Sequence, residues 1–195
     1  MQEFMQFGQV ANFKTNSNIP IEKFPIAINT NLKKSIRIKS AEDVDLRFHS
    51  RLNCKKKTYR YIIDNSKYGS AIYRNLETHI AISLDIEKMK QAIKYFEGEH
   101  DFKAFKSSGT SSKSSVRTIY KADVIAEGEN IAIDLTGNGF LYNMVRIIAG
   151  TLVEVGLGKI KAEDIPSIIE GKDRTKAGKT LPPQGLMLLS VEYDA

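Results

Sequence analysis

The chain has 195 residues, 42% of them hydrophobic and 27% charged, as expected for a globular protein with its own core. Its net charge of +6 is mildly basic and compatible with a polyanionic partner, but many basic proteins bind no nucleic acid. One cysteine excludes an intrachain disulfide, and the sequence has neither an apolar run of membrane length nor an export signal, so we expect a cytoplasmic protein with no membrane contact. The three histidines are widely spaced, so no metal site is predicted.

The first elements are weakly marked. Order is predicted to begin with a strand over residues 8–13, in which Val10 and Phe13 are expected core contacts. Residues 19–32 are typical of a helix with proline near its start, and Pro25 is expected to break or offset it. Residues 35–39 alternate like a half-buried strand.

A basic and aromatic strand is predicted over residues 53–64. Tyr59 and Tyr61 fall on one face, while Lys56 and Arg60 fall on the other. Such a strand can bind nucleic acid, with cations on phosphates and a ring against a base. It can equally be an edge strand whose lysines discourage aggregation. Composition alone does not choose between these interpretations.

A helix over residues 85–97 is predicted to begin at Asp85 and to bury Met89 and Phe96. The neighbouring His100 and Asp101 are expected to have turn and capping roles rather than to form an acid–base pair. The serine-rich residues 106–115 are predicted to be a mobile basic loop, with a solvated connection slightly favoured over an RNA-binding one. Residues 116–126 and 129–136 then form a hairpin around a turn that contains Gly128.

The central stretch is Gly-Asn-Gly-Phe-Leu-Tyr-Asn-Met-Val-Arg at residues 137–146. Apolar residues then repeat at three- and four-residue spacing, which predicts a helix over residues 140–155. Arg146 lies beside the core face of that helix. The helix start carries unpaired N–H groups, so an added cation would suit a carboxylate or phosphate. The alternative is an arginine that reaches from the core to water. Beyond this helix, residues 162–169 are predicted to be helical and residues 186–193 to form a strand.

Five motifs in this order resemble those of the TruA-type tRNA pseudouridine synthases, over residues 8–193. They are Phe-His-Ser-Arg followed by Lys-Thr-Tyr-Arg-Tyr (residues 48–51 and 57–61), Gly-x-His-Asp-Phe (98–102), the central stretch with Gly150, Asp-Arg-x-x-Ala-Gly (173–178) and Pro-x-Gly-Leu-x-Leu (183–188).

The resemblance implies an α/β (α+β) fold, with antiparallel sheets flanked by helices and two related halves facing across a cleft. Residues 1–46 would be the remnant of an incomplete first half, and residues 47–195 the second half. In that family the residue matching Arg146 pairs with the catalytic aspartate, that matching Tyr59 lies against the target base, and that matching Leu186 contacts the uracil.

The same resemblance implies tRNA as the partner, uridines of the anticodon stem-loop as the substrate, a homodimer, and no metal or organic cofactor. RNA contacts are expected from four basic residues: Arg51, Lys57, Arg60 and Arg74.

One departure concerns the nucleophile. The family's aspartate belongs to an Arg-Thr-Asp-x-Gly-Val-His segment, and counting back from Gly8 places it at Met1. Residues 2–7 do not match that segment either. Two hypotheses follow: an N-terminally truncated synthase, or a non-catalytic RNA-binding protein derived from the family. On either, the 195 residues are expected to make no pseudouridine, and Arg146 to meet water, an anion or a substitute acid.

Overall fold

The computed structural model describes residues 5–109 and 113–194, and the chain divides into two compact units. The first unit combines Met1–Gln9 with Cys54–Ala195, and the second is Val10–Asn53. The serine-rich loop predicted at residues 106–115 lies partly outside the described residues. The expected division at residue 46 concerns two related halves, which compactness does not test, so it stays a prediction.

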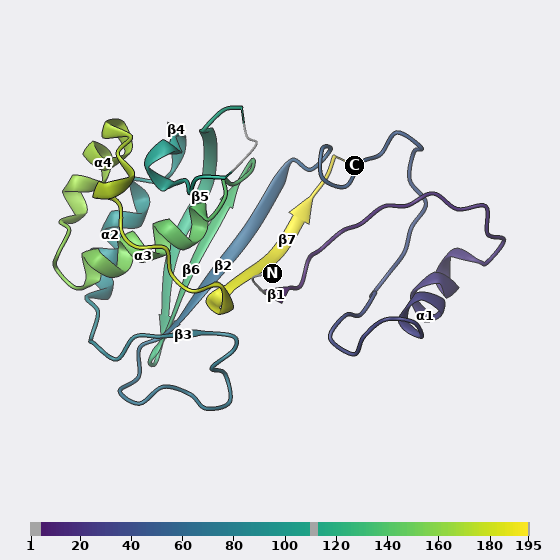
Figure 1. Cartoon of the computed structure of the whole chain (residues 1–195), viewed down its shortest axis with the longest axis horizontal. Coiled ribbons are helices and arrows are strands. Elements are labelled where there is room, and N and C mark those ends of the chain that lie inside the picture. The colour runs from purple at the N-terminus through teal and green to yellow at the C-terminus, as the bar shows by residue number, and fades with distance from the viewer. Residues whose placement is uncertain (1–4, 110–112, 195) are drawn as a thin grey trace. The chain divides into compact units, whose positions relative to one another are not determined.

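A seven-stranded sheet organises the first unit, with the order β1-β7-β2-β6-β5-β4 and β3 paired to β2 (Figure 1). All pairs are antiparallel except β1 with β7 and β2 with β3. The prediction of four strands in one antiparallel sheet is confirmed by β2, β5, β6 and β7. The strands are β1 (Met5–Gln6), β2 (Lys56–Asp64), β3 (Thr78–His79), β4 (Gly98–Asp101), β5 (Val116–Glu127), β6 (Asn130–Gly137) and β7 (Leu186–Glu192).

Three helices, α2 (Ile86–Lys94), α3 (Met144–Gly156) and α4 (Ile165–Gly171), lie on one side of this sheet (Figure 1). The predicted cap of α2 is confirmed, since the Asp85 carboxylate accepts a hydrogen bond of 3.1 Å from the Lys88 N–H. Met89, Ile93 and Phe96 are fully buried. Short 3₁₀ helices connect these elements: η2 (Phe102–Phe105), η3 (Ala162–Asp164), η4 (Arg174–Lys176) and η5 (Pro183–Gly185). The Asp101 side chain caps η2 through the Lys103 N–H, as predicted, but residues 98–101 also form β4, which was not predicted.

Helix α3 is the buried centre of the unit. Twelve of its thirteen residues are buried, so it packs on more than the single face that its periodicity predicts. The expected start at residue 140 is wrong, because Asn143 adopts a left-handed conformation and the helix begins at Met144. Residues 138–143 therefore form an irregular segment that leads into the helix.

Helix α3 is also approached very closely by the loop before β7. A Cβ atom on Gly150 would lie 1.9 Å from the Lys179 carbonyl oxygen, and one on Gly178 would lie 2.5 Å from Gly150 C. The Gly178 N–H also donates to the Thr151 hydroxyl over 2.9 Å. Only glycine fits at either position, which explains two of the glycines in the motifs.

We expect Gly150→Ala to destabilise the protein by about 3 kcal/mol or to prevent folding, because backbone atoms cannot move aside as a flexible side chain can. Gly171→Ala is the matched control, because a Cβ there meets nothing within 4 Å and the residue ends α4. That change is expected to leave stability within about 1 kcal/mol of the original. Thermal unfolding measures both, and equal melting temperatures would contradict the close-packing argument.

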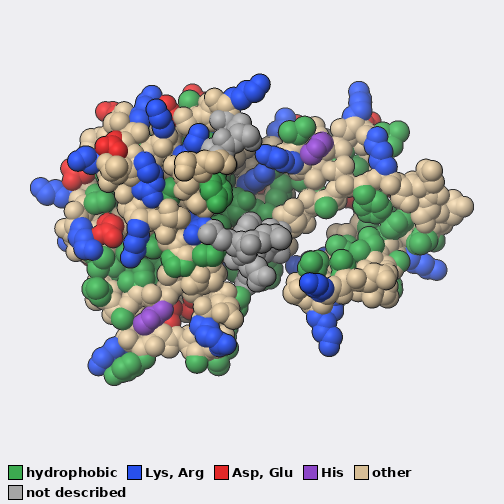
Figure 2. Space-filling model, in the orientation of Figure 1, with side chains coloured by type: hydrophobic (Ala, Val, Ile, Leu, Met, Phe, Trp, Pro, Cys, Tyr) green, Lys and Arg blue, Asp and Glu red, His purple; other side chains and the backbone are tan. Residues whose placement is uncertain are grey.

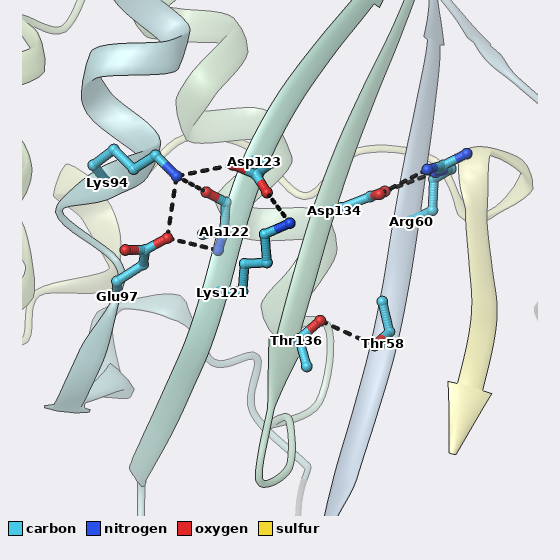
Figure 3. A network of polar contacts seen from close by, with 9 residues as sticks. All are labelled: Thr58, Arg60, Lys94, Glu97, Lys121, Ala122, Asp123, Asp134 and Thr136. Atoms are coloured by element: carbon cyan, nitrogen blue, oxygen red, sulfur yellow. Dashed lines mark hydrogen bonds and ion pairs between the residues drawn. The ribbon is translucent and has the colours of Figure 1, made fainter. Parts of the chain in front are cut away.

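The sheet face away from the helices carries polar pairs (Figure 3). The Arg60 guanidinium donates two hydrogen bonds of 2.7 Å to the Asp134 carboxylate, and the Thr58 and Thr136 hydroxyls lie 3.0 Å apart. A second set of contacts lies at the edge of the sheet, since β4 pairs only with residues 116–119 of β5 and leaves the rest of that strand without a neighbour on this side. There, Glu97 accepts from the Ala122 N–H over 2.9 Å and Lys94 donates to the Ala122 carbonyl over 2.7 Å. These side chains occupy backbone groups through which an exposed strand would pair with another chain.

The second unit contains a 3₁₀ turn, η1 (Ile21–Lys23), followed by helix α1 (Phe24–Asn29). Pro25 stands in the first turn of α1, so the helix predicted over residues 19–32 is offset and shortened as expected of a proline there. None of the residues of this unit is fully buried, and Phe13 is 62% exposed.

The strands predicted over residues 8–13 and 35–39 are wrong, and Val10 and Phe13 are not core residues. An alternating pattern yields a strand only where a neighbour provides backbone partners and an apolar layer. A neighbouring strand is available instead to Met5 and Gln6, which pair with Met187 and Leu188 of β7.

Candidate functional site

A pocket of about 360 Å³ opens in the first unit, and it brings together Tyr59, Arg146 and Leu186, which come from β2, α3 and the start of β7. The irregular residues before α3 and the turn before β7 complete it. The full lining is Tyr59, Phe140, Leu141, Tyr142, Asn143, Met144, Val145, Arg146, Pro183 and Leu186.

Tyr59 projects to the helix-covered side of the sheet, because it alternates with the fully buried Tyr61 and Ile63. Its ring meets that of Phe140 edge to face, with centroids 5.2 Å apart. Burial raises the pKa of the Tyr59 hydroxyl, because an apolar environment disfavours the charged phenolate. An aromatic ring held in this way is suited to pack against another planar group.

Arg146 is only 7% exposed, yet its guanidinium is held by specific hydrogen bonds. Nε donates to the Leu181 carbonyl over 2.6 Å, and Nη1 donates to the Asn143 side-chain oxygen over 2.9 Å. Burial lowers the pKa of Arg146, but a guanidinium remains charged in proteins. The pocket therefore contains a fixed positive charge among largely apolar walls, which favours an anionic partner.

The turn that carries Leu186 is fixed at two successive carbonyl groups. The Leu181 carbonyl accepts from Arg146 Nε, and the Pro182 carbonyl accepts from the Tyr61 hydroxyl over 2.7 Å. The Tyr61 oxygen also lies 2.6 Å from the Thr78 hydroxyl, and burial raises the pKa of Tyr61 to about 12. Arg146 thus sets the position of the neighbouring pocket wall as well as providing charge.

None of the four basic candidates is among the residues that line this pocket. Arg60 lies on the opposite sheet face from Tyr59 and is paired with Asp134, so it presents less charge than the sequence suggests. Lys57 shares the Tyr59 face of β2 and is half-buried, while Arg74 is exposed and donates to the Ala71 carbonyl. Arg51 belongs to the second unit. Figure 2 shows Lys and Arg side chains spread over the visible surface rather than confined to one patch.

Sequence reasoning did not find Asn143 or the Leu181 carbonyl. Asparagine is among the few residues that tolerate a left-handed conformation, and its place just before the apolar repeat was a usable signal. The carbonyl leaves no trace in the side-chain pattern and needs the tertiary structure to be seen.

A second hollow, of about 300 Å³, has three acidic residues in its lining, namely Asp64, Glu77 and Glu129. The Asp64 carboxylate accepts from the Ser66 and Ser70 N–H groups, which gives it a structural role in the loop. Its negative charge is the wrong sign for binding a polyanion.

Within residues 5–109 and 113–194, no group of three His, Cys, Asp or Glu side chains is arranged to hold a metal ion. In the same part of the chain, no helix has the length and hydrophobicity needed to cross a bilayer.

Comparison with known proteins identifies the family. The sequence model of the family described as tRNA pseudouridine synthase matches residues 92–194. The chain is 53% identical over 186 residues to tRNA pseudouridine synthase A of Caldicellulosiruptor saccharolyticus, covering 95% of this chain and 76% of that protein. It is 51% identical over 186 residues to the same-named protein of Acetivibrio thermocellus, with the same coverage, and 52% identical over 188 residues to that of Ruminiclostridium cellulolyticum, covering 96% and 77%. Identity of this degree over nearly the whole chain places it, together with its α/β fold, in the tRNA pseudouridine synthase family.

Proposed function

We propose that this chain binds tRNA and holds a uridine in the pocket formed by Tyr59, Arg146 and Leu186. The observation that carries the proposal is their convergence, since residues 59, 146 and 186 are far apart in sequence and line one hollow. The family is one of isomerases, and the pocket offers what a flipped base requires: a ring, an apolar wall and a fixed charge. We propose, as finer points, that the uridine belongs to the anticodon stem-loop and that the protein acts as a cytoplasmic homodimer.

The reaction assigns each residue a task. Uridine is isomerised by breaking its C–N glycosidic bond and forming a C–C bond, with a carboxylate adding covalently to the base or ribose. The base must first leave its stack, and Tyr59 would then lie against it while Leu186 lines its pocket. Arg146 would keep the attacking carboxylate ionised, because a nearby opposite charge favours the charged form.

The carboxylate itself is not among the described residues that line the pocket. Strand β1 suggests where it belongs. Met5 pairs in parallel with Met187, so the chain enters β1 at the end of β7 where Leu186 lines the pocket. An aspartate carried by a segment before β1 would approach Arg146 from that side. The absence of an acid from the described lining also favours a second candidate, a protein that binds RNA without altering it.

Binding is tested with an unmodified tRNA transcript. We expect Lys57→Ala and Arg74→Ala each to weaken binding and to reduce the slope of log K against log salt by about 1, as loss of a phosphate contact does. Arg60→Ala is expected to have a smaller effect, because Asp134 already pairs with that guanidinium.

Lys90→Ala is the matched control for this series. Lys90 is an exposed lysine on α2, its ion-pair partner is Glu87, and it has no predicted role in RNA binding. Affinities and salt slopes that are the same for all four variants as for the original chain would contradict tRNA binding at these residues.

A further inference from the structure

Asn143 occupies an unusual position at the start of α3. Its backbone is left-handed, with φ 62° and ψ 8°, and only Lys172 among the other non-glycine described residues has a positive φ. An asparagine directly before a helix normally caps it with its side chain, but here no such hydrogen bond is made. Its side chain therefore has another use.

The side-chain amide of Asn143 joins two parts of the unit. Nδ2 donates to the Ser107 hydroxyl over 3.0 Å, and Oδ1 accepts from Arg146 Nη1 over 2.9 Å. The Ser107 N–H in turn donates to the Tyr142 carbonyl over 3.2 Å. Because a guanidinium has only donors, the oxygen must face Arg146, and the Ser107 contact holds the amide in that orientation.

Two of these contacts act on the guanidinium itself. The Leu181 carbonyl accepts from Nε and the Asn143 oxygen accepts from Nη1. Because the guanidinium is one planar unit, a contact at either nitrogen restricts the motion of the whole group, so loss of the Asn143 oxygen is expected to loosen Nε as well. Asn143 and Arg146 both line the pocket, so the plane of the guanidinium determines how the charge is presented there.

We propose that Asn143 is a positioning residue for Arg146, which sets the plane of the guanidinium toward the carboxylate that takes part in the reaction. This inference rests on the proposed function above. A neutral amide suits the task, because it orients the arginine without neutralising it. An aspartate at the same place would form an ion pair with Arg146 and compete with the reacting carboxylate.

The first test needs no turnover. In the 195-residue chain labelled with ¹⁵N-arginine, hydrogen exchange of the Arg146 Nε–H is followed by NMR, with the signal assigned through Arg146→Lys. Asn143→Gly keeps the left-handed backbone accessible but removes the amide, and we expect exchange to become about tenfold faster. The backbone N–H of Gly178, bonded to Thr151 beside α3, should keep its protection.

Lys172→Gly is the matched variant, because it relieves the other positive φ without touching the pocket. Its Arg146 Nε–H should exchange as in the original chain. Unchanged exchange in Asn143→Gly, or equal acceleration in Lys172→Gly, overturns the inference.

The second test uses a version of the chain extended upstream by the Arg-Thr-Asp segment. Asn143→Gly should lower kcat by about 100-fold and leave KM for tRNA nearly unchanged, because a misplaced group costs rate rather than binding. Asn143→Asp should be the poorer of the two. When Arg146 is already replaced by lysine, neither Asn143→Gly nor Asn143→Asp should lower kcat further. If the losses in kcat from the two positions add instead, Asn143 does not act through Arg146, and the inference is overturned. If the extended chain has no turnover, the isomerase part of the proposed function fails, while the exchange measurement still decides whether Asn143 positions Arg146.

Discussion

The purified 195-residue chain is expected to form no pseudouridine in an unmodified tRNA transcript, whereas a version extended upstream by an Arg-Thr-Asp segment is expected to turn over. The difference should be on the order of 10⁴-fold or more, as when a nucleophile is removed from other enzymes. A nucleophile must be held within bonding reach of the base, and small displacements already reduce rates strongly. Position 1, where the family's motif would place the aspartate, is methionine.

Pseudouridine formed over time is the measurement, and the control is the extended version with asparagine in place of the restored aspartate. That control keeps the added segment and should be as inactive as the short chain. Turnover by the short chain at the rate of the extended one would show that another carboxylate serves. An inactive extended chain that still binds tRNA would instead support the non-catalytic RNA-binding hypothesis.

The sequence predicted best the elements whose signals are local and mutually consistent. The hairpin of β5 and β6 was marked by alternation around a turn, and α2 by Asp85 before an apolar face. It failed for residues 8–13 and 35–39, because alternation describes a face but does not provide a neighbouring strand. Strand β4 was missed since Gly-Glu-His-Asp has the composition of a turn, and only pairing with β5 makes it extended.

For the candidate site, the sequence likewise predicted some features and not others. Tyr59, Arg146 and Leu186 could be named because each belongs to a motif, and their common pocket agrees with the family resemblance. Their support could not be read from the sequence. The Leu181 and Pro182 carbonyls, bound by Arg146 and Tyr61, carry no side-chain signal. The ion pair of Arg60 with Asp134 depends on strand register, which joins residues 74 positions apart.

Substitution of Arg146 is expected to have two separable effects, one on stability and one on the site. Arg146→Met keeps an unbranched side chain in α3 but leaves the Leu181 carbonyl and the Asn143 oxygen without this donor. Loss of such hydrogen bonds at a buried position costs about 1–3 kcal/mol in the free energy of unfolding. In the extended chain, kcat should fall by about 10³-fold, because the charge that we propose to orient the carboxylate is also gone.

Arg174 provides a matched control. Its Nη1 donates to the Ala177 and Gly178 carbonyls over 3.3 and 2.9 Å, its Nη2 donates to the Thr180 hydroxyl, and it does not line the pocket. Arg174→Met should therefore lose stability by a similar amount, about 1–3 kcal/mol, with turnover nearly unchanged below its melting temperature. Arg146→Lys should lie between the two, since it retains the charge but cannot bind both acceptors in one plane. Equal losses of kcat in Arg146→Met and Arg174→Met would mean that Arg146 acts only by holding the fold, because both side chains bind backbone carbonyls and only one of them faces the pocket.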